Sequence, residues 1–161
     1  MKIIRGRYDI FSECNSGDAV CVTTNGIVNK NGNAVMGKGI ALQAKNLFPN
    51  IDIKLGSYLK EHGNRVFNLG VWNLNGKIIR VFSYPTKHHW KDPSDVTLIC
   101  KSAEELALMV ESGKFSISGS SINNILLPAV GCGNGGLIWE VSVEPWLSNI
   151  LIDDSYVAYV P

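Results

Sequence analysis

Two glycine-rich runs, each directly after a short apolar stretch, constrain this chain more than any other feature. The first run spans 25–40 and follows A-V-C-V-T-T at 19–24, and the second spans 131–136 and follows the apolar stretch 124–130. Short apolar stretches bounded by turn signals are typical of buried strands. Glycine allows positive φ and lets a backbone approach a ligand closely. The pattern therefore predicts two inner strands that each end in a ligand-binding loop.

The rest of the chain alternates between strand and helix signals, which predicts a layered α/β fold. We expect strands over 2–5, 19–24, 65–73, 77–84, 124–130 and 156–160, and helices over 40–48, 51–61, 92–112 and 143–152. Asn75-Gly76 predicts a hairpin between 65–73 and 77–84, so the sheet should be mixed. For the third helix, Asp92 suits the N-cap, Pro93 the first helical position and Gly113 the end.

Composition and charge exclude several classes of protein. Apolar residues make up 45% of the chain and charged residues 18%, and no repeat or linker divides 1–161, which predicts a single domain. A net charge of +1 argues against a DNA-coating protein, whereas a small anionic ligand needs only backbone amides and a few lysines. Four cysteines in no zinc or redox pattern, no membrane span and no signal peptide predict a cytoplasmic, metal-independent protein with reduced thiols.

Both glycine runs resemble nucleotide-binding motifs without matching them. Gly32 to Lys38 almost spells the phosphate loop of triphosphate hydrolases, but Gly39 stands where the magnesium-binding hydroxyl belongs. The second run satisfies G-x-G-x-x-G, yet only 25 residues follow Gly136, too few for the rest of a dinucleotide-binding sheet. The free N–H groups of a helix beginning near Gly39 would suit a phosphate. We therefore expect two loops that bind a diphosphate, and the alternative is a pair of simple turns.

Three segments in this order resemble the macrodomain family: V-M-G-K-G-I-A-L-Q-A-K at 35–45, Y-P-T-K-H-H-W at 84–90, and L-P-A-V-G-C-G-N-G-G-L at 127–137 with Trp139. Within that family they are most similar to the branch of DNA ADP-ribosyl glycohydrolase antitoxins and related phage and bacterial proteins. The resemblance covers nearly the whole chain. It implies a three-layer α/β/α macrodomain fold with a central mixed sheet and an ADP-ribose cleft between the loops after two inner strands.

The resemblance also implies ligand-binding residues. Asp9 and Ile10 match the family's Gly-Asp-Ile segment, with Tyr8 in place of the glycine, so Asp9 would accept a hydrogen bond from the adenine amino group. Asn25 and Asn33 would lie near the distal ribose. The diphosphate and distal ribose would contact Gly37, Lys38, Gly39, Ile40 and Ala41 on one side and Gly131, Cys132, Gly133, Asn134, Gly135 and Gly136 on the other. The alternative for Asp9 and the two asparagines is a role as turn residues.

Lys87 is the candidate catalytic residue, because the lysine of a matching Pro-Thr-Lys-x-x-Trp segment is implicated in glycosidic cleavage in the related antitoxins. A lysine near the anomeric carbon can protonate a leaving group or attack as a neutral amine, and the alternative is a solvated surface lysine. The nearby terminal ADP-ribose glycohydrolase pairs its lysine with an aspartate at the position of Gly135, so that carboxylate is missing here. At most one of His88 and His89 should face the cleft.

The resemblance implies a hydrolase that removes ADP-ribose from a macromolecule or cleaves an ADP-ribose derivative, without a cofactor. One alternative is a non-catalytic module that reads or sequesters ADP-ribose or an NAD-derived signal nucleotide, and another is an ADP-ribose 1″-phosphate phosphatase. The acceptor stays open among DNA, protein and a small molecule, with nucleic acid expected only as a modified substrate. We expect Trp90, Trp139 and Trp146 to be core residues rather than platforms for a base.

Overall fold

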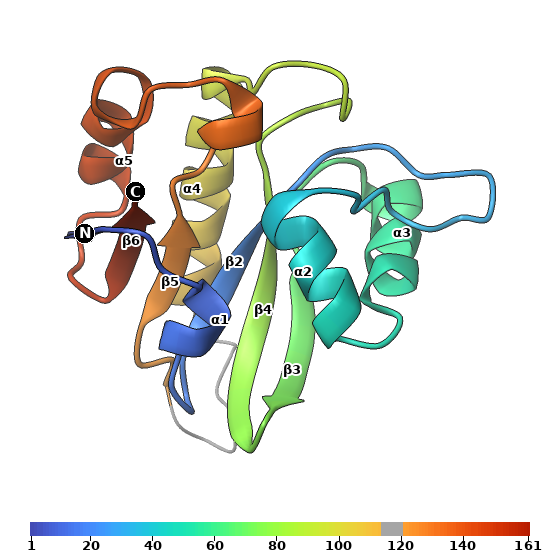
Figure 1. Ribbon diagram of the computed structural model, residues 1–161, viewed down its shortest axis with the longest axis horizontal. Helices are drawn as coiled ribbons and strands as arrows, with labels where there is room; N and C mark the ends of the chain where they lie inside the picture. The colour runs from blue at the N-terminus through green and yellow to red at the C-terminus, as the bar shows by residue number, and fades with distance from the viewer. Residues whose placement is uncertain (114–120) are drawn as a thin grey trace.

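The computed structural model describes residues 1–113 and 121–161, and over these residues six strands form one mixed sheet (Figure 1). The strands are β1 (Lys2–Arg5), β2 (Ala19–Thr24), β3 (Asn68–Leu74), β4 (Lys77–Pro85), β5 (Ile125–Pro128) and β6 (Tyr156–Val160), in the order β1-β6-β5-β2-β4-β3. Every neighbouring pair is parallel except β3 and β4, which form the predicted antiparallel hairpin. The sequence-based prediction of a mixed sheet is thus confirmed.

Helices cover both faces of the sheet (Figure 1). They are α1 (Ile10–Glu13), α2 (Gly39–Leu47), α3 (Ile51–His62), α4 (Val96–Glu111) and α5 (Glu144–Ile150). Successive side chains of a strand point to opposite faces. Accordingly Val20 and Val22 of β2 pack with α1, α2 and α3, whereas Ala19 and Cys21 pack with α4 and α5. Two apolar cores on the two faces of one sheet make a three-layer α/β/α fold, as expected.

The start of α4 differs from the sequence-based prediction by one turn. Asp95, not Asp92, is the N-cap, and its carboxylate accepts hydrogen bonds from the backbone N–H groups of Thr97 and Leu98. The Asp95 N–H in turn donates to the Thr86 carbonyl at 2.9 Å. This contact fixes the helix start three residues later and leaves 86–94 as a loop at the end of β4.

One strand boundary and one unpredicted helix reflect backbone N–H groups that donate to side chains. β3 begins at Asn68 rather than at 65, because the Val66 N–H donates to the Glu105 carboxylate and the Phe67 N–H donates to the Ser83 hydroxyl. The short helix α1 was not predicted; Asp9 caps it by accepting from the Phe11 N–H.

All four cysteines are free, and no helix of the described residues is long and apolar enough to cross a membrane.

Candidate functional site

The carboxyl ends of three parallel strands meet at one edge of the sheet. β2 pairs in parallel with both β4 and β5, so the loops that follow these three strands converge. In open α/β sheets this edge is where ligands bind. A cavity of about 540 Å³ lies here, lined by the ends of β2 and β5, both glycine runs and the loop after β4. Its volume falls in the usual range of sites for small molecules.

The first glycine run forms one wall of this cavity. Gly37, Lys38, Gly39, Ile40 and Ala41 all line it. α2 begins at Gly39 with no side-chain cap and no acidic residue in its first turn. A helix start leaves backbone N–H groups without intrahelical acceptors and carries partial positive charge. This wall is therefore suited to bind an anion.

The second glycine run forms the opposite wall, where Gly131, Cys132, Gly133, Asn134 and Gly135 line the cavity. Gly131 and Gly133 have φ of 79° and 65°, a region that side chains rarely adopt. A Cβ on Gly39 would lie 3.7 Å from the Asn134 amide nitrogen, so the two glycine runs approach each other. The structure thus brings together the two predicted loops.

Ser94 contacts the second glycine run through a backbone hydrogen bond and close packing. The Ser94 N–H donates to the Gly135 carbonyl at 3.0 Å. A Cβ on Gly135 would lie only 2.1 Å from the Ser94 hydroxyl, so residue 135 has no room for a side chain. Packing, and not only local sequence, therefore requires glycine at this position.

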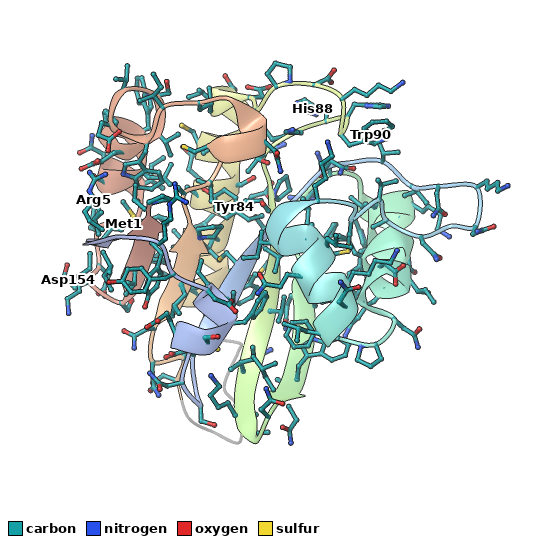
Figure 2. The ribbon with its side chains drawn as sticks, viewed as in Figure 1. Met1, Arg5, Tyr84, His88, Trp90 and Asp154 are labelled. Atoms are coloured by element: carbon teal, nitrogen blue, oxygen red, sulfur yellow. The ribbon has the colours of Figure 1, made fainter. Side chains whose placement is uncertain are left out.

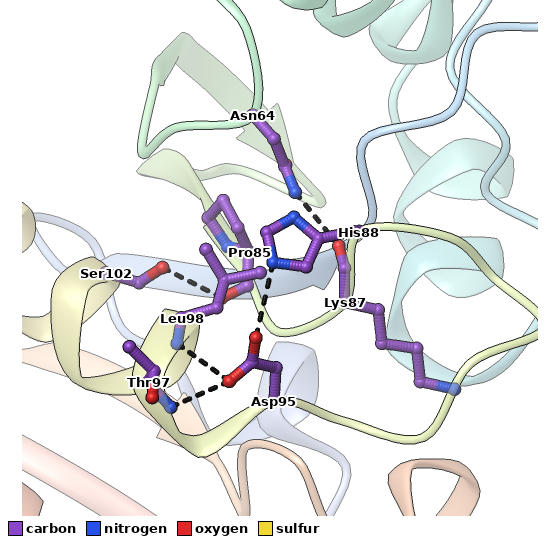
Figure 3. Close-up of polar contacts among 8 residues, drawn as sticks. All are labelled: Asn64, Pro85, Lys87, His88, Asp95, Thr97, Leu98 and Ser102. Carbon is purple, nitrogen blue, oxygen red and sulfur yellow. Dashed lines mark hydrogen bonds and ion pairs between the residues drawn. The ribbon is translucent and has the colours of Figure 1, made fainter.

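The segment that carries Lys87 is fixed through its backbone (Figure 3). Asn64 donates to the Lys87 carbonyl at 2.9 Å, and Ser102 donates to the Pro85 carbonyl at 2.8 Å. The Gly26 N–H donates to the His88 carbonyl at 3.1 Å. The Lys87 side chain lines the cavity, and its Nζ donates to the Asn134 carbonyl at 3.2 Å. Lys87 therefore reaches across the cavity from a rigid support to the second glycine run.

The charge of the cavity suits an anionic ligand. Among the described residues that line it, Lys38 and Lys87 are cationic and no aspartate or glutamate is present. Burial raises the pKa of the Cys132 thiol, and Glu140 adds to the rise. The thiol therefore stays protonated near neutral pH and is a poor nucleophile. Among the described lining residues, Lys38 and Lys87 therefore remain the candidates for contact with an anion or for proton transfer.

No family model matches this sequence. It is 32% identical over 129 residues to a DNA ADP-ribosyl glycohydrolase of Mycobacterium tuberculosis, covering 78% of this chain and 34% of that protein. The solved macrodomain of Mycobacterium tuberculosis DarG matches 99% of this chain over 97% of its own, with 29% identity and a TM-score of 0.74. This chain is a macrodomain of the DarG-like branch.

The macrodomain spans about a third of the length of the curated relatives it matches, at 34% for the Mycobacterium tuberculosis protein. A further solved structure, Thermosipho africanus DarTG in complex with ADP-ribose, has a TM-score of 0.75 at 23% identity and covers 99% of this chain and 42% of its own. At that identity the likeness shows the fold alone.

The structure places four predicted ligand-binding residues of the macrodomain outside this cavity. They are Asp9, Ile10, Asn33 and Gly136. The Asp9 carboxylate caps α1 and also accepts from Ser12 and, at 2.8 Å, from the Gln43 amide. Gly136 lines an adjoining hollow instead. An adenine contact at Asp9 therefore stays a prediction, and it would require an oxygen that already accepts a protein hydrogen bond.

Asn25 and Asn33 have local structural partners. The Asn25 side chain lines the cavity, but its amide donates to the Val35 carbonyl at 3.0 Å and its oxygen accepts from the Ile27 N–H at 2.9 Å. The Asn33 N–H donates to the Asn29 side chain, and the Asn33 Cα would lie 2.9 Å from a Cβ on Gly56 of α3. Asn25 shapes the first glycine run, whereas Asn33 packs against a helix.

Neither histidine of the 87–91 segment lines the cavity. His88 Nε2 lies 3.3 Å from the Asp95 carboxylate, and Figure 3 shows the Lys87 side chain extending away from both. The His89 ring accepts from the Lys91 N–H at 3.0 Å. These contacts give the two histidines roles in loop structure, and neither ring lies at the cavity wall.

The expectation that three tryptophans belong to the core is confirmed for Trp139 and wrong for Trp90 and Trp146. Trp139 is 3% exposed, whereas Trp90 is 49% and Trp146 is 56% exposed. Trp90 lines the cavity beside Lys87. One sequence signal could have identified Trp90 as a residue outside the core. It lies in the polar run K-H-H-W-K, which lacks the apolar periodicity of a core element.

Proposed function

We propose that this macrodomain binds ADP-ribose in the cleft between its two glycine runs and hydrolyses the bond that joins ADP-ribose to a DNA base. The observation that carries the proposal is the convergence of an uncapped helix start, a second glycine run and a fixed lysine on one cavity. The name DNA ADP-ribosyl glycohydrolase of relatives at 32% identity supports both the reaction and the ADP-ribose ligand.

In this proposal the diphosphate lies between the first turn of α2 and the second glycine run, where backbone N–H groups are the donors. The distal ribose then extends toward Lys87. The C1″–N bond of the base breaks as the Lys87 ammonium donates a proton to the leaving nitrogen, and water adds to C1″. The water's proton returns to the Lys87 amine, so that the lysine is regenerated. A lysine ammonium has three donors and no acceptor, which suits a proton donor.

Release of ADP-ribose from an ADP-ribosylated single-stranded oligonucleotide tests this proposal. For Lys87→Ala we expect kcat to fall by roughly 10²- to 10⁴-fold, the usual contribution of a general acid. The backbone of Lys87 carries the loop contacts, so the melting temperature should stay close to that of the wild type. The matched control is Lys101→Ala, an exposed lysine of α4 outside the cleft. Full turnover by Lys87→Ala would refute the role of Lys87.

One observation favours the second candidate function, a binding module without turnover. No carboxylate among the described residues lines the cleft, so none is positioned there to activate water. A binding module would bind ADP-ribose and release no product from any ADP-ribosylated substrate. Binding by wild type without turnover on nucleic acid, peptide or phosphate ester would therefore select this alternative.

A further inference from the structure

A second hollow, which we call the acceptor hollow, adjoins the cleft at Lys87. It measures about 380 Å³, and it shares Lys38, Lys87, Trp90, Asn134 and Gly135 with the cleft. Lys91, Asp92, Pro93 and Gly136 line only the hollow. Because the two spaces meet at Lys87, a group bonded to the distal ribose of a bound ADP-ribose would enter the hollow.

We infer that the acceptor hollow binds single-stranded DNA, with the base that carries ADP-ribose stacked on Trp90 and a flanking phosphate beside Lys91. This inference rests on the proposed function and adds to it the residues that recognise the acceptor. It makes Trp90 a specificity-determining residue, separate in role from the glycine runs that would bind ADP-ribose.

Trp90 has the properties of a stacking platform. The side chain is 49% exposed although tryptophan is normally well buried, and Figure 2 shows it at the end of the molecule opposite the β3–β4 turn. The His89 ring lies 5.3 Å from the Trp90 ring, and Lys91 Nζ lies 5.1 Å from its centroid. The neighbouring loop backbone is fixed by the Asn64 and Gly26 hydrogen bonds. An ordered, exposed aromatic ring can stack on an unpaired base at little entropic cost.

The charge of the hollow fits a phosphodiester strand. Three lysines, Lys38, Lys87 and Lys91, line it against a single acid, Asp92. Within the described residues neither Lys38 nor Lys91 forms an ion pair with a carboxylate, although the whole chain has a net charge of only +1. A local excess of lysines beside an aromatic ring is the arrangement that binds single strands. A base inside a duplex is stacked and could not reach Trp90 without leaving the helix.

The experiment compares affinities for free ADP-ribose and for a short ADP-ribosylated single-stranded DNA. Both are measured in the Lys87→Ala background, so that the oligonucleotide is not cleaved during the measurement. We expect the oligonucleotide to bind more tightly than ADP-ribose. Adding Trp90→Ala should weaken oligonucleotide binding by roughly 5- to 150-fold, the range for loss of one base–aromatic stack. Affinity for free ADP-ribose should fall by a smaller factor, since Trp90 also lines the cleft but free ADP-ribose lacks the acceptor base that would stack on it. Trp90→Phe should restore most of the loss.

Lys91 provides an independent readout through salt. Lys91→Ala should lower the slope of log affinity against log salt by about 0.7 for the oligonucleotide, as expected for loss of one phosphate contact to a single strand. Lys101→Ala, the matched control, should leave that slope unchanged. Annealing a complementary strand should reduce the affinity toward that of ADP-ribose alone.

Several outcomes would overturn the inference. They are an equal loss for both ligands in Trp90→Ala, no loss for the oligonucleotide, and an unchanged salt slope in Lys91→Ala. A wild type that fails to bind ADP-ribose would instead refute the proposed function. A wild type that binds ADP-ribose but never cleaves the oligonucleotide refutes only the hydrolase activity. The ratio of the affinities for oligonucleotide and ADP-ribose still tests the role of Trp90.

Discussion

Replacing Gly37 by glutamate tests directly whether the diphosphate lies at the start of α2. Gly37 lines the cavity, its φ lies outside the left-handed region, and a Cβ there would have no atom within 4 Å. A side chain at residue 37 therefore costs neither backbone strain nor packing. Gly133 is less suitable, because its φ of 65° would strain any other residue.

The expected loss follows from the repulsion between the new carboxylate and a phosphate. Two unit charges about 5 Å apart repel by about 3 kcal/mol at an effective dielectric constant of 20 and by about 1 kcal/mol in water. The mouth of the cavity lies between these limits. Gly37→Glu should therefore weaken ADP-ribose binding by roughly 5- to 150-fold for each phosphate charge that it approaches.

Isothermal titration of ADP-ribose against Gly37→Glu and Gly37→Gln isolates this charge effect, because the two side chains have nearly the same shape. We expect Gly37→Gln to retain most of the wild-type affinity and Gly37→Glu to lose it, with a smaller difference at high salt. Affinities of both variants close to that of the wild type would refute the placement of the diphosphate at α2. Complete loss of binding in both variants would refute the charge argument and show that the ligand needs the space at residue 37.

Three further predictions concern stability. Gly135→Asp should lower the melting temperature without adding activity, because its Cβ would lie 2.1 Å from the Ser94 hydroxyl. Overpacking of this kind costs about 1–3 kcal/mol, and adding Ser94→Gly should restore the melting temperature. Asp95→Ala should lower the free energy of unfolding by about 1 kcal/mol in chemical denaturation, through loss of the α4 cap, and Asp95→Asn should lose less. Burial raises the pKa of Tyr156 to about 12, so its phenol ionises in the unfolded chain before it does in the folded one. Stability should therefore fall as pH rises from the ordinary tyrosine value toward about 12, and Tyr156→Phe should make that fall less steep in a pH series of denaturant titrations.

Elements whose determinants are local were predicted from the sequence. The strand over 19–24 and the strand over 156–160 match β2 and β6, and the helix over 51–61 differs from α3 by one residue. The start of α4 was wrong because Asp92 and Asp95 are equally good caps by local chemistry. The choice between them depends on the bond from the Asp95 N–H to Thr86, nine residues away and across a loop.

For the site, glycine patterns and the resemblance predicted the loops but not the orientation of their side chains. Loops lack the periodicity that tells which face a residue occupies. Asn25 lines the cavity as expected, yet its amide is bonded within its own loop. Trp90 was expected in the core because tryptophan is usually buried, and only the structure shows it at the cavity wall. The packing of Ser94 beneath Gly135 joins residues 41 apart in the sequence and has no local signal.

The packing of Ser94 against Gly135 affects the chemistry of the site as well as its stability. An aspartate at position 135 would not fit, since a Cβ there would lie 2.1 Å from the Ser94 hydroxyl. Lys38 stands at the start of α2, where the anion is expected, and burial keeps the Cys132 thiol protonated. Among the described lining residues this leaves Lys87 as the proton donor that we propose, and an ammonium can donate before it can accept. In the proposed reaction the bond to the base must therefore be largely broken before water attacks, through a transition state with oxocarbenium character. Such a reaction depends on how well the leaving base is held, which gives Trp90 and the acceptor hollow a direct bearing on rate as well as on recognition.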